Sequence, residues 1–260
     1  MAVAAKASSA IEVVELDYQT VEITVVGRNP IILNKLAAKA RQELLFPSGR
    51  KTPADKLAHL KHNPMQEFRD SAHILESEDQ PTLLGFPAGG MKKAMSLAAL
   101  RTSKGQSGGV SKTEFKQLCW VENEFIPIYG TPKLMMSVTR QAGMNATPDI
   151  RTRLVVPEWS STFRVTFIRP NLNDKAISNL IHAAGLVSGI GDWRPEKGSG
   201  TFGQFALVDE DNIIAQKIRS EGGREEQIAA MENPEAYDRE TQQLLDWWTN
   251  ELSERGRTTK

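Results

Sequence analysis

A glycine-rich segment late in the chain constrains the fold more than any other part of the sequence. It reads GLVSGIGDWRPEKGSGTFGQF over residues 185–205, follows a helical pattern and leads into the strand pattern FGQFALV. Rossmann and P-loop sites need the order strand, loop, helix, so that a phosphate meets a helix N-terminus. Here the order is helix, loop, strand, and the pattern G-x-x-x-x-G-K-[ST] is absent. The sequence therefore argues against both types of nucleotide-phosphate site.

The same segment combines glycines with a tryptophan and two basic residues. Glycine lets a backbone adopt positive φ and approach another chain closely. Arginine and lysine bind phosphates, and tryptophan offers a face for stacking. Two interpretations stay open: a loop that binds nucleic acid, and a long loop beside a sheet with the tryptophan as its packing anchor. The residues concerned are Gly189, Gly191, Gly198, Gly200, Gly203, Trp193, Arg194 and Lys197.

The elements around this segment predict an α+β fold. Alternating or β-branched runs indicate strands at 21–26, 118–130, 133–140, 151–156 and 161–168. Apolar spacing and capping residues indicate helices at 34–45, 64–74, 88–100, from Asn173 to about residue 187, and at 234–252. Residues 101–116 are basic and rich in glycine, so we expect a mobile loop there. Helices alternate with strands of antiparallel character, which is typical of the α+β class.

The charge balance hides a basic core. The chain has 260 residues with 32 basic and 32 acidic side chains, a formal net charge of zero. Residues 1–20 hold one base and three acids, and residues 221–260 hold five bases and ten acids. This leaves 26 bases and 19 acids in residues 21–220, a net charge of +7. A polyanion responds to the charge of one surface rather than to the total, so the overall neutrality does not exclude a nucleic-acid partner.

Much of this positive charge lies between residues 85 and 155, where ten bases face four acids. Such a run is more often a solvated face than a binding site, but here it spans several elements and a flexible segment. We therefore treat its members as candidate nucleic-acid contacts. Those chosen are Lys92, Lys93, Arg101, Lys104, Lys112, Lys116, Arg140, Arg151 and Arg153, together with Trp193, Arg194 and Lys197 from the glycine-rich loop.

Little in the sequence suggests catalysis. His59 and His62 are three residues apart, but no cysteine or carboxylate completes a zinc pattern, and His182 lies beside an apolar stripe. No G-x-S-x-G or H-E-x-x-H signature is present. The single cysteine, Cys119, reads as a small buried apolar residue. We expect a protein without enzymatic activity, cofactor, metal or membrane partner, located in the cytoplasm, because one cysteine fits a reducing compartment.

Three segments in order resemble the RAMP superfamily, the RNA-binding proteins of CRISPR effector complexes, and above all its backbone subunits. The segments are VEITVVGRNPIIL (21–33), FPAGGMKKAMSLAAL (86–100) and the strand–helix–loop–strand run 161–208. The resemblance implies a modified RRM/ferredoxin-like core, with residues 189–203 as the family's glycine-rich loop and 88–100 as a helix that presents basic residues to RNA. The chain is short for a full backbone subunit, which fits a stand-alone member encoded by a phage and acting in the host cytoplasm.

The charge distribution and the resemblance together predict three parts of the chain. These are an acidic N-terminal extension (1–19), an RRM-like core (20–210) with a basic loop near 101–116, and an acidic helical extension (211–260). The expected function is binding of single-stranded RNA or DNA, with head-to-tail self-assembly into a filament. One alternative is a structural or interaction protein that mimics or blocks a CRISPR effector subunit without binding nucleic acid. A second is a guide-RNA-processing ribonuclease, in which His59, His62 or His182 would be required for cleavage.

Overall fold

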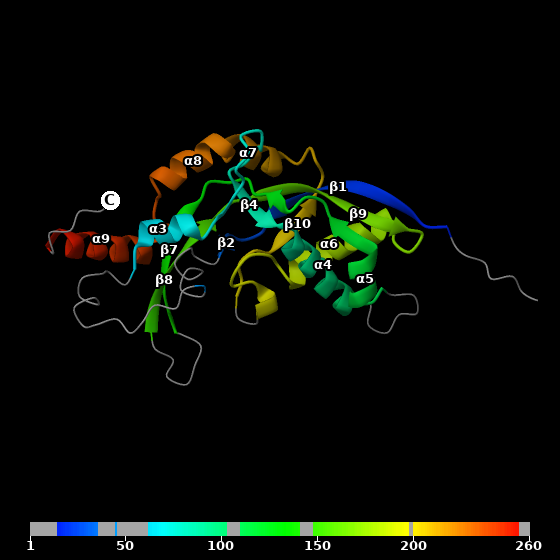
Figure 1. Cartoon of the computed structure of the whole chain (residues 1–260), viewed down its shortest axis with the longest axis horizontal. Helices are drawn as coiled ribbons and strands as arrows, with labels where there is room; N and C mark the ends of the chain where they lie inside the picture. Colours follow the sequence, from blue (N-terminus) through cyan, green and yellow to red (C-terminus); the bar gives the residue numbers. More distant parts are fainter. Residues whose placement is uncertain are drawn as a thin grey trace, which may run out of the picture.

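The computed structural model describes residues 15–35, 45, 62–102, 110–140, 148–197 and 200–254. A four-stranded antiparallel sheet runs through its centre (Figure 1). In sheet order its strands are β10 (Phe205–Val208), β1 (Asp17–Gly27), β9 (Ser160–Arg169) and β5 (Cys119–Val121). The strand expected at 21–26 lies within β1, but it is not half-buried: residues 23–26 are all buried, because Val26 on the second face packs with Ala215 and Ile218.

Three helices cover one face of this sheet. They are α4 (Ala88–Thr102), α5 (Lys112–Leu118) and α6 (Asp174–Val187), which lie below the sheet in Figure 1. Met91 and Met95 of α4 are fully buried in the main core. Asn173 caps α6, because its side chain accepts a hydrogen bond from the Ala176 amide at 2.9 Å.

A long hairpin extends from the central sheet. It consists of β7 (Lys133–Arg140) and β8 (Pro148–Val156), and β8 also pairs with the short β2 (Ile31–Leu33). A third small sheet contains β3 (His73–Ile74), β4 (Leu84–Pro87) and β6 (Phe125–Pro127). Helix α3 (Pro64–Asp70) precedes it and contacts the hairpin strand β8.

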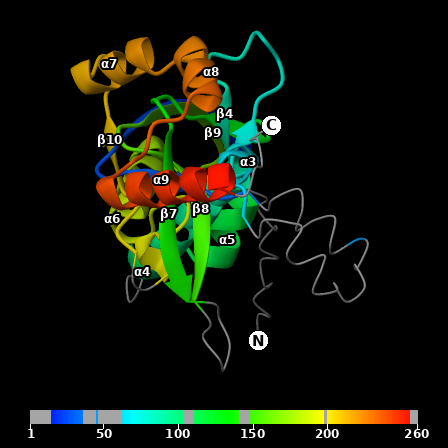
Figure 2. The same cartoon turned by 90° about the vertical axis from the view of Figure 1, so that its left-hand side faces the viewer.

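The C-terminal part forms three further helices, α7 (Ile213–Glu221), α8 (Arg224–Glu232) and α9 (Arg239–Glu254). Helix α7 lies on the face of the central sheet opposite α4, where Ala215 and Ile218 pack with Val26. Helix α9 crosses the hairpin (Figure 2), and the Thr241 hydroxyl accepts a hydrogen bond from the Met136 amide at 3.1 Å.

One buried amide joins these C-terminal helices to the body. Gln227 of α8 is fully buried. Its Oε1 accepts from two backbone N–H groups and its Nε2 donates to three backbone carbonyls, at 2.7 to 3.2 Å. The partners are Leu83, Leu84, Ile128, Gly130 and Gly222.

The α+β class is confirmed, and the helices at 88–100 and after Asn173 and most expected strands are present. The single strand expected at 118–130 is instead two short strands, β5 and β6, which lie in different sheets. The helix expected at 64–74 ends at Asp70, because His73 and Ile74 pair with β4 instead. The helix expected from Pro234 begins at Arg239, because Ala236 forms a bridge to Leu134. Of the helix expected at 34–45 the structure describes Asn34, Lys35 and Leu45: Asn34 and Lys35 are not helical, whereas Leu45 is helical and exposed.

The prediction of a loop at 101–116 is wrong at both ends. Helix α4 continues through Thr102, and α5 begins at Lys112. A capping box starts α5: the Ser111 hydroxyl accepts from the Glu114 amide at 3.2 Å, and the Glu114 carboxylate accepts from the Ser111 amide at 2.8 Å. The hydrogen bond from the Ser111 amide to the carboxylate, with a smaller contribution from the Ser111 hydroxyl, lowers the pKa of Glu114 below its ordinary value, because it favours the ionised form.

We predict that Gln227→Leu destabilises the protein by about 2–4 kcal/mol, because five buried backbone groups lose their partner. The free energy of unfolding from urea titration checks this value. The matched control Gln216→Leu, at an exposed position of α7, should stay within about 0.5 kcal/mol of the wild type. Equal effects of the two substitutions would contradict the role given to Gln227.

Candidate nucleic-acid interface

The glycine-rich loop is a folded structure held against β2. The Asp192 amide donates to the Ile32 carbonyl at 2.9 Å, and the Gly203 amide donates to the Pro30 carbonyl at 2.8 Å. The two arms of the loop are joined by a hydrogen bond from the Ile190 amide to the Gly203 carbonyl at 2.9 Å. A short 3-10 turn, η1 (Pro195–Lys197), forms its tip.

Glycine is required at several positions of this loop. Gly191 and Gly203 have φ values of 83° and 70°, which disfavour a side chain. A Cβ on Gly203 would lie 1.7 Å from the Ile190 carbonyl oxygen. A Cβ on Gly200 would lie 1.5 Å from the Trp193 carbonyl oxygen. Gly189 also has a positive φ of 64°, and Gly198 lies outside the described residues.

Trp193 anchors the loop on the hairpin sheet. It is half-buried and packs on the cluster of Ile32, Met135 and Val155. The Arg153 guanidinium lies 4.6 Å from the indole centroid, a cation–π distance. Trp193 also holds a positive φ of 49°, an uncommon conformation for a large residue. These contacts support the interpretation of Trp193 as a packing anchor. The residue is only half-buried, so part of it stays exposed.

Arg153 lies inside this junction. It is 6% exposed, and its Nε lies 3.1 Å from the Asp192 Oδ2, which also accepts from the Asn34 Nδ2 at 2.9 Å. Burial lowers the pKa of Arg153 and the Asp192 charge opposes that change. Its buried Nη1 has no hydrogen-bond partner among the described residues. The Arg153 guanidinium joins β8 to the loop. Because it is buried, Arg153 is not among the exposed cations that could contact nucleic acid.

Arg194 is also engaged within the loop. Its Nε donates to the Glu196 Oε2 at 2.8 Å, and its Nη1 donates to the Gly191 carbonyl at 2.6 Å. The second oxygen of Glu196 lies 4.0 Å from the Lys93 Nζ on α4. Burial raises the pKa of Glu196, but the hydrogen bond and charge of Arg194, with the charges of Lys93 and Lys197, bring it below its ordinary value. Glu196 therefore places the loop within ion-pair distance of α4, although an exposed pair of this length contributes little stability.

These two ion pairs bring α4, the loop and the hairpin together on one side of the central sheet (Figure 1). On these elements and on the neighbouring α5, Lys93, Lys116, Arg151 and Lys197 are exposed, and Lys92 and Lys112 are half-buried. The structure places the backbone of Arg101 at the end of α4 and that of Arg140 at the end of β7, but their side chains lie outside the described residues. Lys104 lies wholly outside them.

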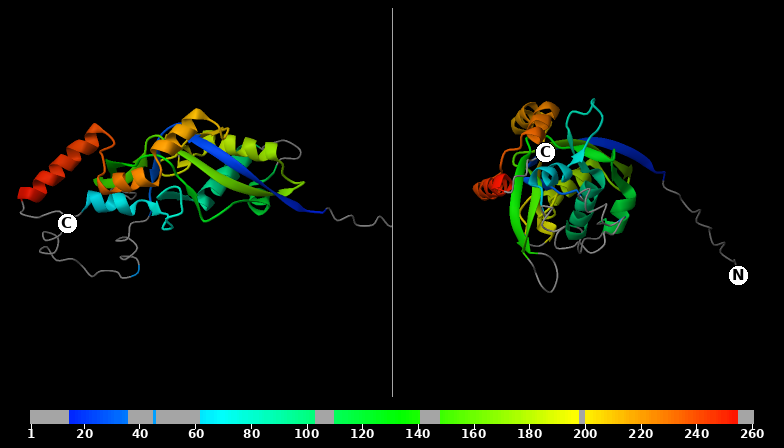
Figure 3. Two further views of the ribbon diagram at one scale, coloured as in Figure 1. Left: turned by 90° about the horizontal axis from the view of Figure 1, so that it is seen from above. Right: turned by 60° about the vertical axis from the view of Figure 1, so that its left-hand side comes forward.

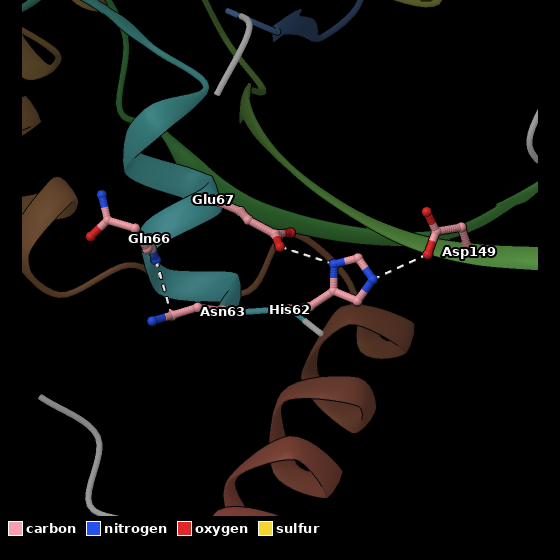
Figure 4. A network of polar contacts seen from close by, with 5 residues as sticks. All are labelled: His62, Asn63, Gln66, Glu67 and Asp149. Carbon is pink, nitrogen blue, oxygen red and sulfur yellow. Dashed lines mark hydrogen bonds and ion pairs between the residues drawn. The ribbon is translucent and has the colours of Figure 1, made fainter. Parts of the chain in front are cut away.

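A polar network near the hairpin could not be predicted from the sequence (Figure 4). The His62 Nδ1 lies 2.9 Å from the Glu67 Oε1, and its Nε2 lies 3.1 Å from the Asp149 Oδ1. The spacing of His62 and Glu67 is a local signal, but Asp149 comes from a strand 87 residues away. No group of three or more His, Cys, Asp or Glu residues suited to a metal occurs within the part of the chain that the structure describes.

The remaining cysteine and histidine candidates from the sequence show no features of a reactive site among the described residues. Burial raises the pKa of Cys119 to about 12, with the Lys92 charge opposing, so its thiol stays protonated at neutral pH. His182 is exposed on α6, and His59 lies outside the described residues. None of the described helices is both long and apolar enough to cross a membrane.

Comparison with known proteins adds no relative. No protein-family model matches the chain, and no curated protein matches its sequence.

We predict that Gly203→Ala destabilises the fold by at least about 2 kcal/mol, because the new methyl meets the Ile190 carbonyl and the φ is positive. The midpoint of thermal unfolding measures the effect. Gly89→Ala on α4 is the matched control: its Cβ meets nothing within 4 Å, so it should stabilise the helix by about 0.5–1 kcal/mol. A loss of stability for Gly89→Ala similar to that of Gly203→Ala would refute the special role of the loop glycine.

A second prediction concerns Glu196, whose folded-state pKa is lowered. A lowered carboxyl pKa contributes stability above the unfolded pKa and loses it as pH falls through the folded pKa. We therefore expect the wild type to exceed Glu196→Gln in stability at pH 7, with a difference that shrinks below about pH 4.5. Urea titrations of both proteins across pH 3–7, an interval covering both pKa values, test this; a constant difference would contradict it.

Proposed function

We propose that the chain is a non-enzymatic protein that binds single-stranded nucleic acid, with an RRM-like core of RAMP type, and that it assembles head to tail along the strand. The order of elements supports the core. Along the chain the central sheet reads β1, α4, β5, β9, α6, β10, and in space the strands lie in the order β10-β1-β9-β5. A β-α-β-β-α-β order with the fourth strand beside the first fits the ferredoxin-like arrangement.

The observation that carries the binding proposal is the group of cations around the folded loop. Lys92 and Lys93 on α4, Lys197 in the loop and Arg151 on β8 come from elements that the Lys93–Glu196 and Arg153–Asp192 pairs hold together. Such cations from several elements can contact successive phosphates of one strand. Lys112 and Lys116 extend the positive charge onto α5, which packs beside α4.

The indole of Trp193 supplies the second element of the proposal. Stacking between bases and aromatic side chains is tolerant of sequence and suits single strands. The contacts with Arg153 and with Phe202, whose ring centroid lies 6.0 Å away, fix the indole before any ligand arrives. A fixed side chain loses less conformational entropy on binding. In this proposal Arg153 and Arg194 shape the loop, whereas the exposed lysines and Arg151 contact phosphates.

Binding of fluorescent single-stranded RNA and DNA oligonucleotides tests the proposal. The double variant Arg151→Gln/Lys197→Gln should bind at least about tenfold more weakly at low salt. It should also lower the slope of log K against log salt by about 1.4, because two phosphate contacts are lost. The matched control Lys217→Gln, at an exposed position of α7 on the opposite face of the sheet, should bind as the wild type does.

Three outcomes separate the proposal from its rivals. Undetectable single-strand binding at low salt, or equal losses for Lys217→Gln and the double variant, would overturn it. Assemblies that form free of nucleic acid and bind none would favour the structural or effector-mimicking role. Cleavage of a hairpin RNA that is lost in His62→Ala or His182→Ala would favour the ribonuclease.

A further inference from the structure

Helix α9 borders an apolar cavity that the rest of the chain only partly covers. The cavity has a volume of about 230 Å³. Most small-molecule sites enclose roughly 300–1,000 Å³, so this cavity has room for one or two apolar side chains. Its apolar lining comes from α3, the hairpin and α9, and we call these residues the α9 pocket: Pro64, Met136, Ile150, Leu244, Trp247 and Trp248.

One wall of the α9 pocket is fixed by the polar network of His62. This residue also lines the cavity. Its ring nitrogens lie 2.9 Å from the Glu67 carboxylate and 3.1 Å from the Asp149 carboxylate, which joins α3 to β8 (Figure 4). A preformed wall lowers the conformational entropy that a ligand must overcome on binding.

Trp247 is accessible from outside the pocket. It is 63% exposed. Helix α9 lies at one end of the molecule along its longest axis (Figures 1 and 3), where another protein can approach it. An exposed tryptophan beside an apolar cavity is typical of a surface that binds a protein segment.

Three acids lie on the same side of α9 as Trp247. A helix turns by about 100° per residue. By this turn, Glu240, Glu251 and Glu254 all lie within about 40° of Trp247 around the helix axis. Residues 240–254 contain no base. The side of α9 that carries Trp247 therefore combines an apolar cavity with negative charge along its length.

The spacing of these acids favours a peptide segment as the ligand. Glu240 and Glu254 lie about 21 Å apart along the helix axis. A molecule small enough for the cavity cannot reach both carboxylates, whereas a peptide with an apolar centre and basic ends can. A nucleic-acid strand is disfavoured here, because its phosphates carry the same sign of charge as the acids.

Strongly exposed apolar side chains of the chain itself fit this surface less well. Ile213 and Tyr18 are 82% and 68% exposed. Asp211 lies two residues before Ile213, and Asp17 lies directly before Tyr18. Docking either of them on α9 of a second copy would bring acids close to acids, which disfavours the contact. The charges therefore favour a separate partner.

We propose that this side of α9 binds a segment of a partner protein in which apolar side chains are flanked by lysine or arginine. An apolar side chain of the segment fills the α9 pocket and covers Trp247, while its bases lie beside Glu240, Glu251 and Glu254. Such a contact is of the groove-binding type, in which buried apolar anchors give affinity and charges set orientation and partner choice. The inference goes beyond the proposed function, because it adds a protein partner on a surface separate from the loop cations.

Fluorescence anisotropy of dye-labelled peptides tests this proposal on nuclease-treated protein at low salt. The probe KKALLKALLKK has leucines on one helical side and lysines at both ends. The matched peptide EEALLEALLEE reverses its charge, and KKASSKASSKK removes its leucines. The wild type should bind the probe at least about tenfold more tightly than either matched peptide, and added salt should weaken that binding.

Variants separate the pocket side of α9 from the rest of the surface. Trp247→Ser should weaken binding of the probe at least about tenfold, whereas Ile213→Ser, at a more exposed apolar position outside α9, should bind as the wild type does. The double variant Glu240→Gln/Glu254→Gln should weaken binding about three- to tenfold. Asp246→Asn is its matched control and should stay within about twofold, because Asp246 is an exposed acid turned by about 100° from Trp247. Circular dichroism and thermal melting confirm that each variant is folded.

Four results would overturn the proposal. They are the absence of saturable binding of the probe, equal binding of either matched peptide, full binding by Trp247→Ser, and equal losses for Asp246→Asn and the double variant. Self-association of the wild type that is lost in Trp247→Ser would overturn it in favour of a second copy. Arg151→Gln/Lys197→Gln should bind the probe within about twofold of the wild type. Failure of this inference and failure of the proposed function therefore appear in different variants and with different ligands.

Discussion

The ion pair between the buried Arg153 and the partly exposed Asp192 is the interaction on which the candidate interface most depends. It joins a strand of the hairpin sheet to a loop that also contacts β2 and, through Glu196, α4. Removing one partner of such a pair costs about 3–5 kcal/mol, because the other charge stays buried without compensation. The pair also places a guanidinium against Trp193. The pair therefore adds a side-chain link between the hairpin and a loop whose path is also set by the backbone hydrogen bonds of Asp192 and Gly203 beside β2.

Local patterns predicted much of the fold. The strand at 21–26, the cap at Asn173 and the start of α3 at Pro64 depend on neighbouring residues, and the structure confirms each, although burial on both faces of the strand was not expected. Helix α5 was not predicted, because the basic, glycine-rich composition of 101–116 indicated a loop and the Ser111–Glu114 capping signal within it was missed. The short strand β3 was not predicted either, because its pairing with β4 depends on a segment ten residues further along the chain.

The candidate site was predictable in composition but not in the role of each residue. Arg151 and Arg153 have the same residue type and lie on the same face of β8, yet one is exposed and the other is buried. The difference arises because the loop near Asp192, distant in sequence, covers only the position nearer the base of the hairpin. Arg194 likewise looks like a free cation in the sequence, whereas its neighbour Glu196 binds it in the structure. Distant partners decide which charges stay exposed.

The pairing of β7 with β8 has a further consequence. In that register Met136 and Ile150 lie on the face toward α9, whereas Met135 and Arg153 lie on the face toward the loop. The same two strands therefore form a wall of both candidate surfaces. If a ligand on one side of the hairpin changes the affinity for a ligand on the other side, thermodynamic linkage requires the reverse effect to have the same factor. Such coupling would pass through the two shared strands and would need no movement of whole domains.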